Sequence, residues 1–388
     1  MDSAIFDSLQ QTMTKQGAGP AIEQLCATLR ERQEYASLFY ALLMKKRVEL
    51  GISPLPTGPA SEIPVELQEK YEDGIREAGR TVGKLFLDMG NLQQAYSYFR
   101  MLGEPQAVAE ALDKYTFVEG EDAQGLIELA FHHGANPRRG MEWILEKFGL
   151  CSAITIMGGA LGSGQFPHGN DARDACVKEL VRALHAQLVE RLKYDITRKE
   201  GQAPESRSIR DLIAHRDWLF EDDNYHVDVS HLSSILQMCS QLPKSLELNL
   251  ARDMCNYGLK LAPQFQGQGE PPFDNLYEDM GAYFGIIAGD AVDAGVAHFR
   301  KKAANPDPDY GNNPAAEMLV NTLLQLNKPA EALAVAREFL GKVDDKQLTC
   351  PPMTELCRRL NDYRSLAEVS RERGDPVHFV AGLIAAGK

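Results

Sequence analysis

Residues 83–102, GKLFLDMGNLQQAYSYFRML, decide the fold of this chain. Small and aromatic side chains recur there at spacings of three, four, five and four, at Gly83, Phe86, Gly90, Ala95 and Phe99. Residues three or four apart lie on the same face of an α-helix. The stretch therefore predicts two antiparallel helices joined by a turn at Gly90.

The same spacing predicts how these two helices pack. Small side chains let helices approach closely, so we expect Gly83 and Ala95 to face each other across the hairpin. Gly90 is expected to end the first helix, because glycine adopts a positive φ without a steric penalty. Three large side chains are then left to fill the groove toward the next helix pair, namely Phe86, Phe99 and Leu102.

Related hairpins recur along the chain. Residues 320–339, VNTLLQLNKPAEALAVAREF, carry Asn327 at the expected turn, and residues 280–301 carry Gly289 followed by Asp290. Weaker traces of the same pattern lie at residues 31–39 and 359–367, the second with Asn361 at the expected turn. The pattern therefore predicts repeated helix pairs from end to end.

This pattern resembles the tetratricopeptide repeat, whose signature places small residues at its eighth and twentieth positions, as at Gly83 and Ala95. The resemblance is degenerate and covers roughly half of the chain. It implies an all-α fold in which antiparallel helix pairs stack as an α-solenoid with an irregular central region. It also implies that the concave face binds a peptide or protein partner, without naming that partner.

Proline and glycine divide the chain into zones. We expect N-terminal helices over residues 1–51, helical repeat pairs over 67–150, an irregular, His-rich central helical region over 151–261, and C-terminal helical repeat pairs over 275–388. The prolines of residues 52–64 cannot continue a helix, so this segment is predicted to be a loop.

The central zone loses the regular pattern. Glycines scattered through residues 152–171 predict a long connection, and residues 171–198 predict one strongly amphipathic helix. Shorter helices are expected over 209–220 and 230–241, with Ser230 as the N-cap of the second.

Composition narrows the class of partner. The chain has 388 residues, of which 44% are hydrophobic and 25% charged, as in soluble globular proteins. A net charge of −14 argues against a surface built to hold phosphate backbones, so we expect no nucleic-acid partner. The short basic clusters at residues 45–47, 138–139 and 300–302 are interpreted as helix C-termini, where cations suit the helix dipole.

Cysteine usage and hydropathy indicate the compartment. The 7 cysteines are odd in number and form no Cys-x-x-Cys pair, as expected for reduced thiols. Residues 1–20 lack the basic start and apolar run of a secretory signal, and no stretch reaches the roughly 20 apolar residues of a membrane span. We therefore expect a cytoplasmic protein that does not engage a membrane.

Histidine is distributed unevenly, which points to the central zone as a possible site. Seven of the 9 histidines lie within residues 132–231, namely His132, His133, His168, His185, His215, His226 and His231. Imidazoles are common metal ligands and acid-base groups, so the clustering raises the expectation of chemistry there.

A metal site can be built from the densest part of this zone. If the segment before residue 230 is extended, His226 and Asp228 point the same way, and His231 can join them from the next helix. Two imidazoles and a carboxylate suffice for zinc, iron or manganese with positions left open for water. His132 or His133 would be a further ligand or a proton shuttle, although Gly134 also makes this pair typical of a helix end.

Three other motifs in this zone lack a feature that the chemistry they suggest would require. The spacing Asp222-Asp223-x-x-His226 lacks the third carboxylate of a diphosphate-binding Asp-Asp-x-x-Asp motif. The glycines of residues 158–164 are not followed by the Gly-Lys-Ser or Gly-Lys-Thr of a phosphate-binding loop. Cys151 has no predictable base partner, so it is interpreted as a buried thiol.

Two functions follow from these observations. The first is a helical-repeat scaffold that binds a peptide or protein partner and needs no cofactor. The second is a metal-dependent enzyme, such as a hydrolase, with its site in the His-rich centre. Convergence of the dispersed histidines would favour the enzyme, and a continuous groove the scaffold. The catalytic residues, the partner and the oligomeric state are not determined by the sequence.

Overall fold

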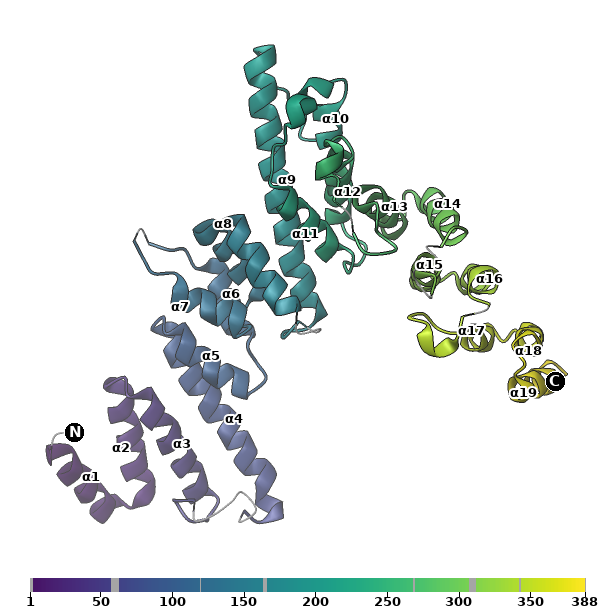
Figure 1. The fold of residues 1–388 in the computed structure, drawn as a ribbon. Helices are drawn as coiled ribbons and strands as arrows, with labels where there is room; N and C mark the ends of the chain where they lie inside the picture. The colour runs from purple at the N-terminus through teal and green to yellow at the C-terminus, as the bar shows by residue number, and fades with distance from the viewer. Residues whose placement is uncertain are drawn as a thin grey trace. The chain divides into compact units, whose positions relative to one another are not determined.

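The computed structural model describes residues 3–56, 63–118, 120–162, 166–267, 269–306, 312–341 and 343–387. These residues form α-helices joined by turns and short 3₁₀ or π segments, and no β-strand occurs among them. The predicted all-α class is confirmed (Figure 1). The chain divides into two compact units, Met1–Trp143 and Ile144–Lys388, called unit 1 and unit 2 below.

Unit 1 is a succession of α-helices, of which the first six pack each on its neighbour along the chain. Their bounds are α1 Ser3–Gln16, α2 Ala18–Glu31, α3 Tyr35–Glu49, α4 Val65–Asp88, α5 Leu92–Met101, α6 Gln106–Lys114 and α7 Gln124–Ile127, followed by a π-helical turn, Glu128–His132. Gln33 has a φ of 58° between α2 and α3, within the weak repeat trace of residues 31–39. The predicted proline-rich loop is seen at 52–56 and 63–64; residues 57–62 lie outside the described part of the chain.

The hairpin α4–α5 forms as the opening stretch predicts, with Gly90 at a φ of 79° between the helices. Its packing differs in detail, because the Phe99 ring itself covers Gly83, at 3.1 Å from where a Cβ would lie. Phe99 therefore fills the hairpin rather than the groove to the next pair. Leu102 likewise lies 3.2 Å from a Cβ placed on Gly79 of α4. Phe86 reaches a neighbouring pair through an edge contact with Tyr35 of α3 at 5.3 Å.

Helix α8, Pro137–Leu161, corrects one expectation. The sequence predicts a long glycine-rich connection from residue 152 onward, but residues 152–161 are helical. A Cβ placed on Gly158 or Gly159 would meet no atom within 4 Å, so both glycines face open space. They lower the stability of the helix only through the conformational freedom of glycine itself. The regular helix is instead interrupted at Gly149, with φ 78° and ψ 175°. The border between the two units falls within α8.

Unit 2 begins within α8 and continues into α9, Asn170–Glu200, the amphipathic helix that the sequence predicts. The next elements are α10 Ile209–Ile213, a 3₁₀ turn Asp217–Asp223, α11 Val229–Cys239 and α12 Glu247–Gly258. The helix expected over 209–220 is thus shorter. Asp228, not Ser230, caps α11, because its carboxylate accepts the Ser230 backbone N–H at 2.8 Å.

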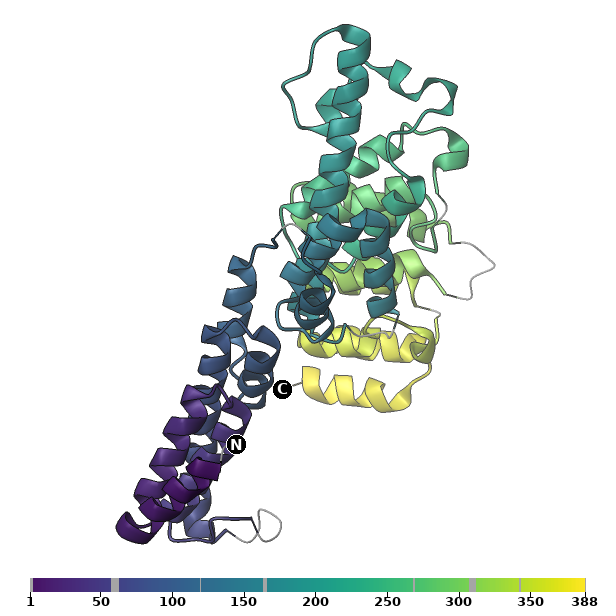
Figure 2. The ribbon, with the colours of Figure 1, turned by 90° about the vertical axis from the view of Figure 1, so that its left-hand side faces the viewer.

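The rest of unit 2 is a ladder of helices in which each element packs on the next (Figures 1 and 2). Its helices are α13 Leu276–Ala288, α14 Val292–Ala303, α15 Pro314–Gln325, α16 Pro329–Phe339, α17 Met353–Arg359, α18 Tyr363–Glu372 and α19 Pro376–Ala386, with 3₁₀ turns at Pro263–Phe265 and Asp345–Gln347. The predicted turn residues Gly289, Asn327 and Asn361 have φ values of 86°, 57° and 54°. These three turns are confirmed, and with them the stack of helix pairs.

Candidate functional site

The central histidines occupy different surroundings. His226 is buried beside α9 and α12: its backbone N–H donates to the Tyr257 hydroxyl at 2.8 Å, and its Nδ1 lies 3.1 Å from the same oxygen. Its Nε2 lies 3.5 Å from an Asp195 carboxylate oxygen. Burial lowers the pKa of His226, and the Asp195 charge opposes that shift. The ring is therefore held as part of a packed aromatic and polar cluster.

Asp228 points elsewhere, because the segment around residue 226 bends instead of running straight. Its carboxylate accepts the Ser230 N–H and, at 2.6 Å, the Ser230 hydroxyl, and these bonds lower its pKa. His231 sits in the first turn of the helix that Asp228 caps. Within the described ranges, no group of three or more His, Cys, Asp or Glu side chains could hold a metal ion. His226, Asp228 and His231 thus do not form a group of three metal ligands.

His132 and His133 belong to unit 1, whereas the 226–231 segment belongs to unit 2. His132 ends the π-helical turn, and the His133 carbonyl accepts a hydrogen bond from the Tyr96 hydroxyl at 2.8 Å. Gly134 follows with a φ of 77°, as expected of a helix terminator. This pair therefore contributes to the end of one helix and to its contact with α5.

The cysteines are free thiols in different surroundings. Cys151 is exposed on the second part of α8, which corrects its interpretation as a buried thiol. Five others are buried, and burial raises the pKa of Cys350 to about 12 and that of Cys357 to about 11. Because the thiolate is the nucleophile, these two side chains are poor candidates for covalent chemistry.

A close histidine–carboxylate contact joins α13 and α14, outside the His-rich zone. His298 Nε2 lies 2.7 Å from Asp279 Oδ1, and Asp279 is fully buried. The other Asp279 oxygen accepts from Lys302 Nζ at 2.6 Å, and Lys302 also donates to Asp274 at 2.9 Å and to the Pro272 carbonyl. This cluster fastens the loop before α13 to α14. Sequence spacing alone did not reveal it, because its members come from a loop and two helices.

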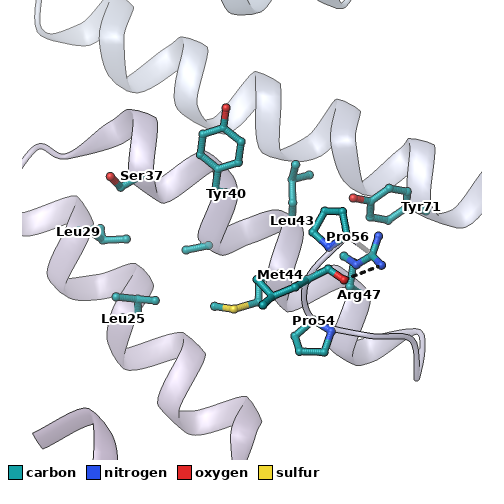
Figure 3. A pocket seen from close by; sticks show the side chains of 12 residues that line it. Leu25, Leu29, Ser37, Tyr40, Leu43, Met44, Arg47, Pro54, Pro56 and Tyr71 are labelled. Atoms are coloured by element: carbon teal, nitrogen blue, oxygen red, sulfur yellow. Dashed lines mark hydrogen bonds between the residues drawn. The ribbon is translucent and has the colours of Figure 1, made fainter. Parts of the chain in front are cut away.

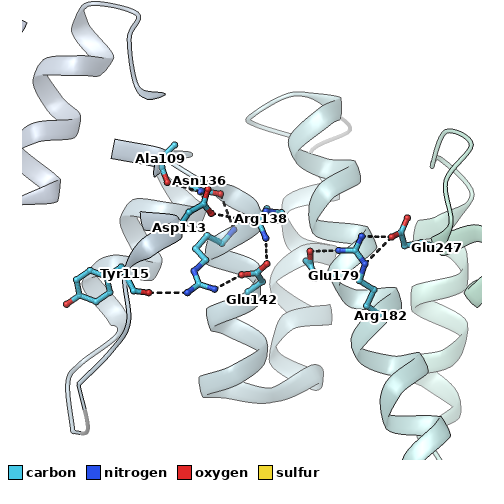
Figure 4. Close-up of polar contacts among 10 residues, drawn as sticks. Ala109, Asp113, Tyr115, Asn136, Arg138, Glu142, Glu179, Arg182 and Glu247 are labelled. Carbon is cyan, nitrogen blue, oxygen red and sulfur yellow. Dashed lines mark hydrogen bonds and ion pairs between the residues drawn. The ribbon is translucent and has the colours of Figure 1, made fainter. Parts of the chain in front are cut away.

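Arginines form further networks within each unit (Figure 4). In unit 1, Arg138 contacts Asp113 at 2.7 Å, and Arg139 donates to Glu142 and to the Tyr115 carbonyl. These two arginines lie at the start of α8, which corrects their interpretation as a helix C-terminus. Residues 46–47 and 300–302 of the other two basic clusters do lie in last turns. In unit 2, Arg182 bridges Glu179 and Glu247. Such saturated networks hold helices together and leave little capacity for a ligand.

Unit 1 has an apolar hollow of about 440 Å³ between α2, α3, the start of α4 and the proline-rich loop (Figure 3). Its lining is mostly aliphatic, aromatic and proline side chains, and one charged residue, Arg47, takes part. Tyr40 and Leu55 on its walls are 70% and 67% exposed. The sequence did not single out this hollow, because its walls are far apart along the chain.

Unit 2 has a hollow of about 610 Å³ between α17, α18 and α19. Its lining combines cationic, aromatic and small apolar side chains, from Glu355, Arg358, Arg359, Tyr363, Leu366, His378, Ala381 and Ala385. It lies between α17 and α19, which are alternate helices of the ladder and so lie on one side of it. We call it the C-terminal groove.

The cations of the C-terminal groove differ in their pairing. Arg359 forms an ion pair with Glu355 at 2.5 Å, and His378 Nδ1 lies 2.6 Å from Asp375. Arg358 is exposed and forms no ion pair with a residue of the described ranges. A ligand carboxylate would therefore meet one guanidinium whose donors are not engaged by an acid.

Helix α8 alone, among the described helices, is long and apolar enough by length and composition to cross a membrane. Its break at Gly149 leaves two shorter helical parts, 137–148 and 150–161. A membrane span needs about 20 residues in one helix. Neither part reaches that length.

No protein-family model, no curated protein and no solved structure matches this chain.

Proposed function

We propose that this protein is a tetratricopeptide-like helical-repeat scaffold in the cytoplasm that binds an extended segment of a partner protein in the C-terminal groove. The observation that carries the proposal is the groove itself, a hollow of about 610 Å³ between alternate helices of the ladder. Stacked helix pairs commonly use such surfaces to hold peptides. The absence of a converging histidine set in the described residues also favours a scaffold over a metal enzyme.

The groove chemistry favours an acidic segment. Arg358 presents a planar fork of donors that suits a carboxylate, and His378 and Arg359 add positive charge nearby. Leu366, Ala381 and Ala385 provide an apolar floor for a neighbouring side chain. A partner strand that alternates an acidic and an apolar residue would satisfy both features.

A defined peptide tests this proposal on the full chain. The probe is a fluorescein-labelled hexapeptide that alternates leucine and glutamate, and its counterpart carries glutamine in place of glutamate. Fluorescence anisotropy should show saturable binding of the glutamate peptide and about tenfold weaker binding of the glutamine peptide, as expected for loss of charge-assisted hydrogen bonds.

Arg358→Ala should weaken binding of the glutamate peptide about tenfold. Arg364→Ala is the matched control, since Arg364 is exposed on α18 but does not line the groove. Equal affinity of both peptides, or equal effects of the two substitutions, would overturn the proposal.

A further inference from the structure

The hollow of unit 1 contains a buried cation. Arg47, in the last turn of α3, is only 6% exposed. Its Nε donates to the Ser53 carbonyl at 2.6 Å, and one terminal nitrogen donates to the Leu55 carbonyl at 3.3 Å. The guanidinium also lies 5.5 Å from the centroid of the Tyr71 ring. No described carboxylate forms an ion pair with it.

This arrangement leaves the charge of Arg47 without an acidic partner among the described residues. A guanidinium has five N–H donors and keeps its charge at all accessible pH values. Two carbonyl bonds use two of those donors and supply dipoles in place of a counter-charge. A buried charge is costly unless an opposite charge accompanies it, so Arg47 is suited to receive an anionic group.

The surroundings of Arg47 are apolar over a long distance. The first hollow, of about 440 Å³, is followed by a second of about 390 Å³ that shares Leu25, Met44 and Pro54 with it. The second hollow continues between α1 and α2, past Met13 and other apolar side chains. The two hollows are therefore adjacent, with Arg47 in the lining of the first, and we call the pair of them the Arg47 trough. Volumes of this size are typical of small-molecule sites.

The geometry points to a binding site for a single-chain amphiphilic carboxylate in the Arg47 trough. The carboxylate accepts hydrogen bonds from the remaining donors of Arg47, and the alkyl chain lies along Met44 and Leu25 toward α1. Burial of the alkyl chain supplies most of the affinity, and the buried ion pair supplies selectivity for an acid head group. This site lies in unit 1, and its ligand class differs from the peptide proposed for unit 2.

The test compares two ligands of equal chain length on the unmodified full chain. Dodecanoate and dodecanol, both below their aggregation concentrations, compete with a fluorescent fatty acid for the protein. We expect dodecanoate to bind at least about tenfold more tightly than dodecanol, because only the acid engages the guanidinium. Equal affinities, or the absence of saturable binding, would overturn the inference without any variant.

Substitutions then locate the site. Arg47→Gln should remove the advantage of dodecanoate over dodecanol, whereas Lys46→Gln, the same charge change one residue earlier and outside the trough, should keep it. Met44→Trp should weaken the binding of both ligands, because the larger side chain fills the trough. This variant keeps Arg47, so it still tests the site if Arg47→Gln fails to fold. If a leucine-rich peptide with a free C-terminal carboxylate displaces the probe at lower concentration than dodecanoate does, the trough is a polypeptide site and the inference is wrong.

Discussion

Single glycines set how closely neighbouring helices approach in both units. In α4, a Cβ on Gly83 would lie 3.1 Å from Phe99, so a side chain there would require the Phe99 ring to shift slightly. In α12, a Cβ on Gly258 would lie 2.4 Å from the Tyr277 ring, which is 2% exposed. The ring has no space to move, so this second site is the stricter of the two.

We therefore expect Gly258→Ala to lower the free energy of unfolding by about 1–3 kcal/mol, as overpacking does in cores. Gly158→Ala is the control, because this glycine is also helical but meets no atom within 4 Å. That change should raise stability by about 0.5–1 kcal/mol through the better helix propensity of alanine. Urea unfolding followed by circular dichroism measures both, and a stabilised Gly258→Ala would contradict the packing argument.

Stability should also depend on pH through His226. Burial lowers its pKa from 6.5, so below about pH 6.5 the unfolded chain binds more protons at this residue than the folded chain does. The free energy of unfolding should therefore rise with pH across that window and fall on acidification. His226→Gln should make the urea midpoint less dependent on pH between about 5 and 8. An unchanged slope would show that the imidazole charges freely in the folded protein.

At the scale of elements, buried polar clusters decide which helices and loops are fixed to one another. Asp279 on α13 joins His298 and Lys302 of α14 while accepting the Asn275 backbone N–H at 2.8 Å. A single fully buried carboxylate thus orders a loop, a helix start and a helix crossing.

Asp279→Ala should lower the free energy of unfolding by about 3–5 kcal/mol, because it leaves Lys302 without its buried counter-charge and His298 without its hydrogen-bond partner. The control is Glu338→Ala on α16, which removes an exposed carboxylate that pairs with Arg300 of α14 at 2.7 Å. This change should lower the free energy of unfolding by about 0–1 kcal/mol. Denaturant unfolding of both variants checks the contrast. Similar losses in the two would mean that the buried cluster contributes no more than a surface pair.

At the scale of the molecule, the two compact units carry different chemistry. The Arg47 trough lies in unit 1, and the C-terminal groove lies in unit 2. Each is built from neighbouring helices of its own unit, the two share no lining residue, and substitutions at sites with no shared partners generally act additively.

We therefore expect Arg47→Gln to leave the affinity of the glutamate peptide within about twofold, and Arg358→Ala to leave dodecanoate affinity equally unaffected. Anisotropy titrations with each probe, in the absence and presence of the other ligand, measure this independence. A larger cross-effect would reveal coupling between the units.

The sequence by itself determined the helical class and many helix ends. Helix periodicity marked α9 and the α4–α5 hairpin, and Gly90, Gly289 and Asn327 occur at turns because their backbones accept a positive φ. Such signals are local, since the residues that decide them lie within one or two turns of helix. The glycine-rich segment predicted from residue 152 onward misled for the same reason: glycine permits a loop but does not require one, and residues 152–161 continue α8.

Only the tertiary structure decided which side chains meet. Histidine clustering in sequence suggested a metal site, yet His226 packs on Tyr257 while Asp228 caps α11. The sequence predicted neither the Arg47 trough nor the C-terminal groove, because packing sets which helix faces form their walls. Spacing within one helix is fixed by backbone geometry, whereas contact between helices depends on how whole faces fit together.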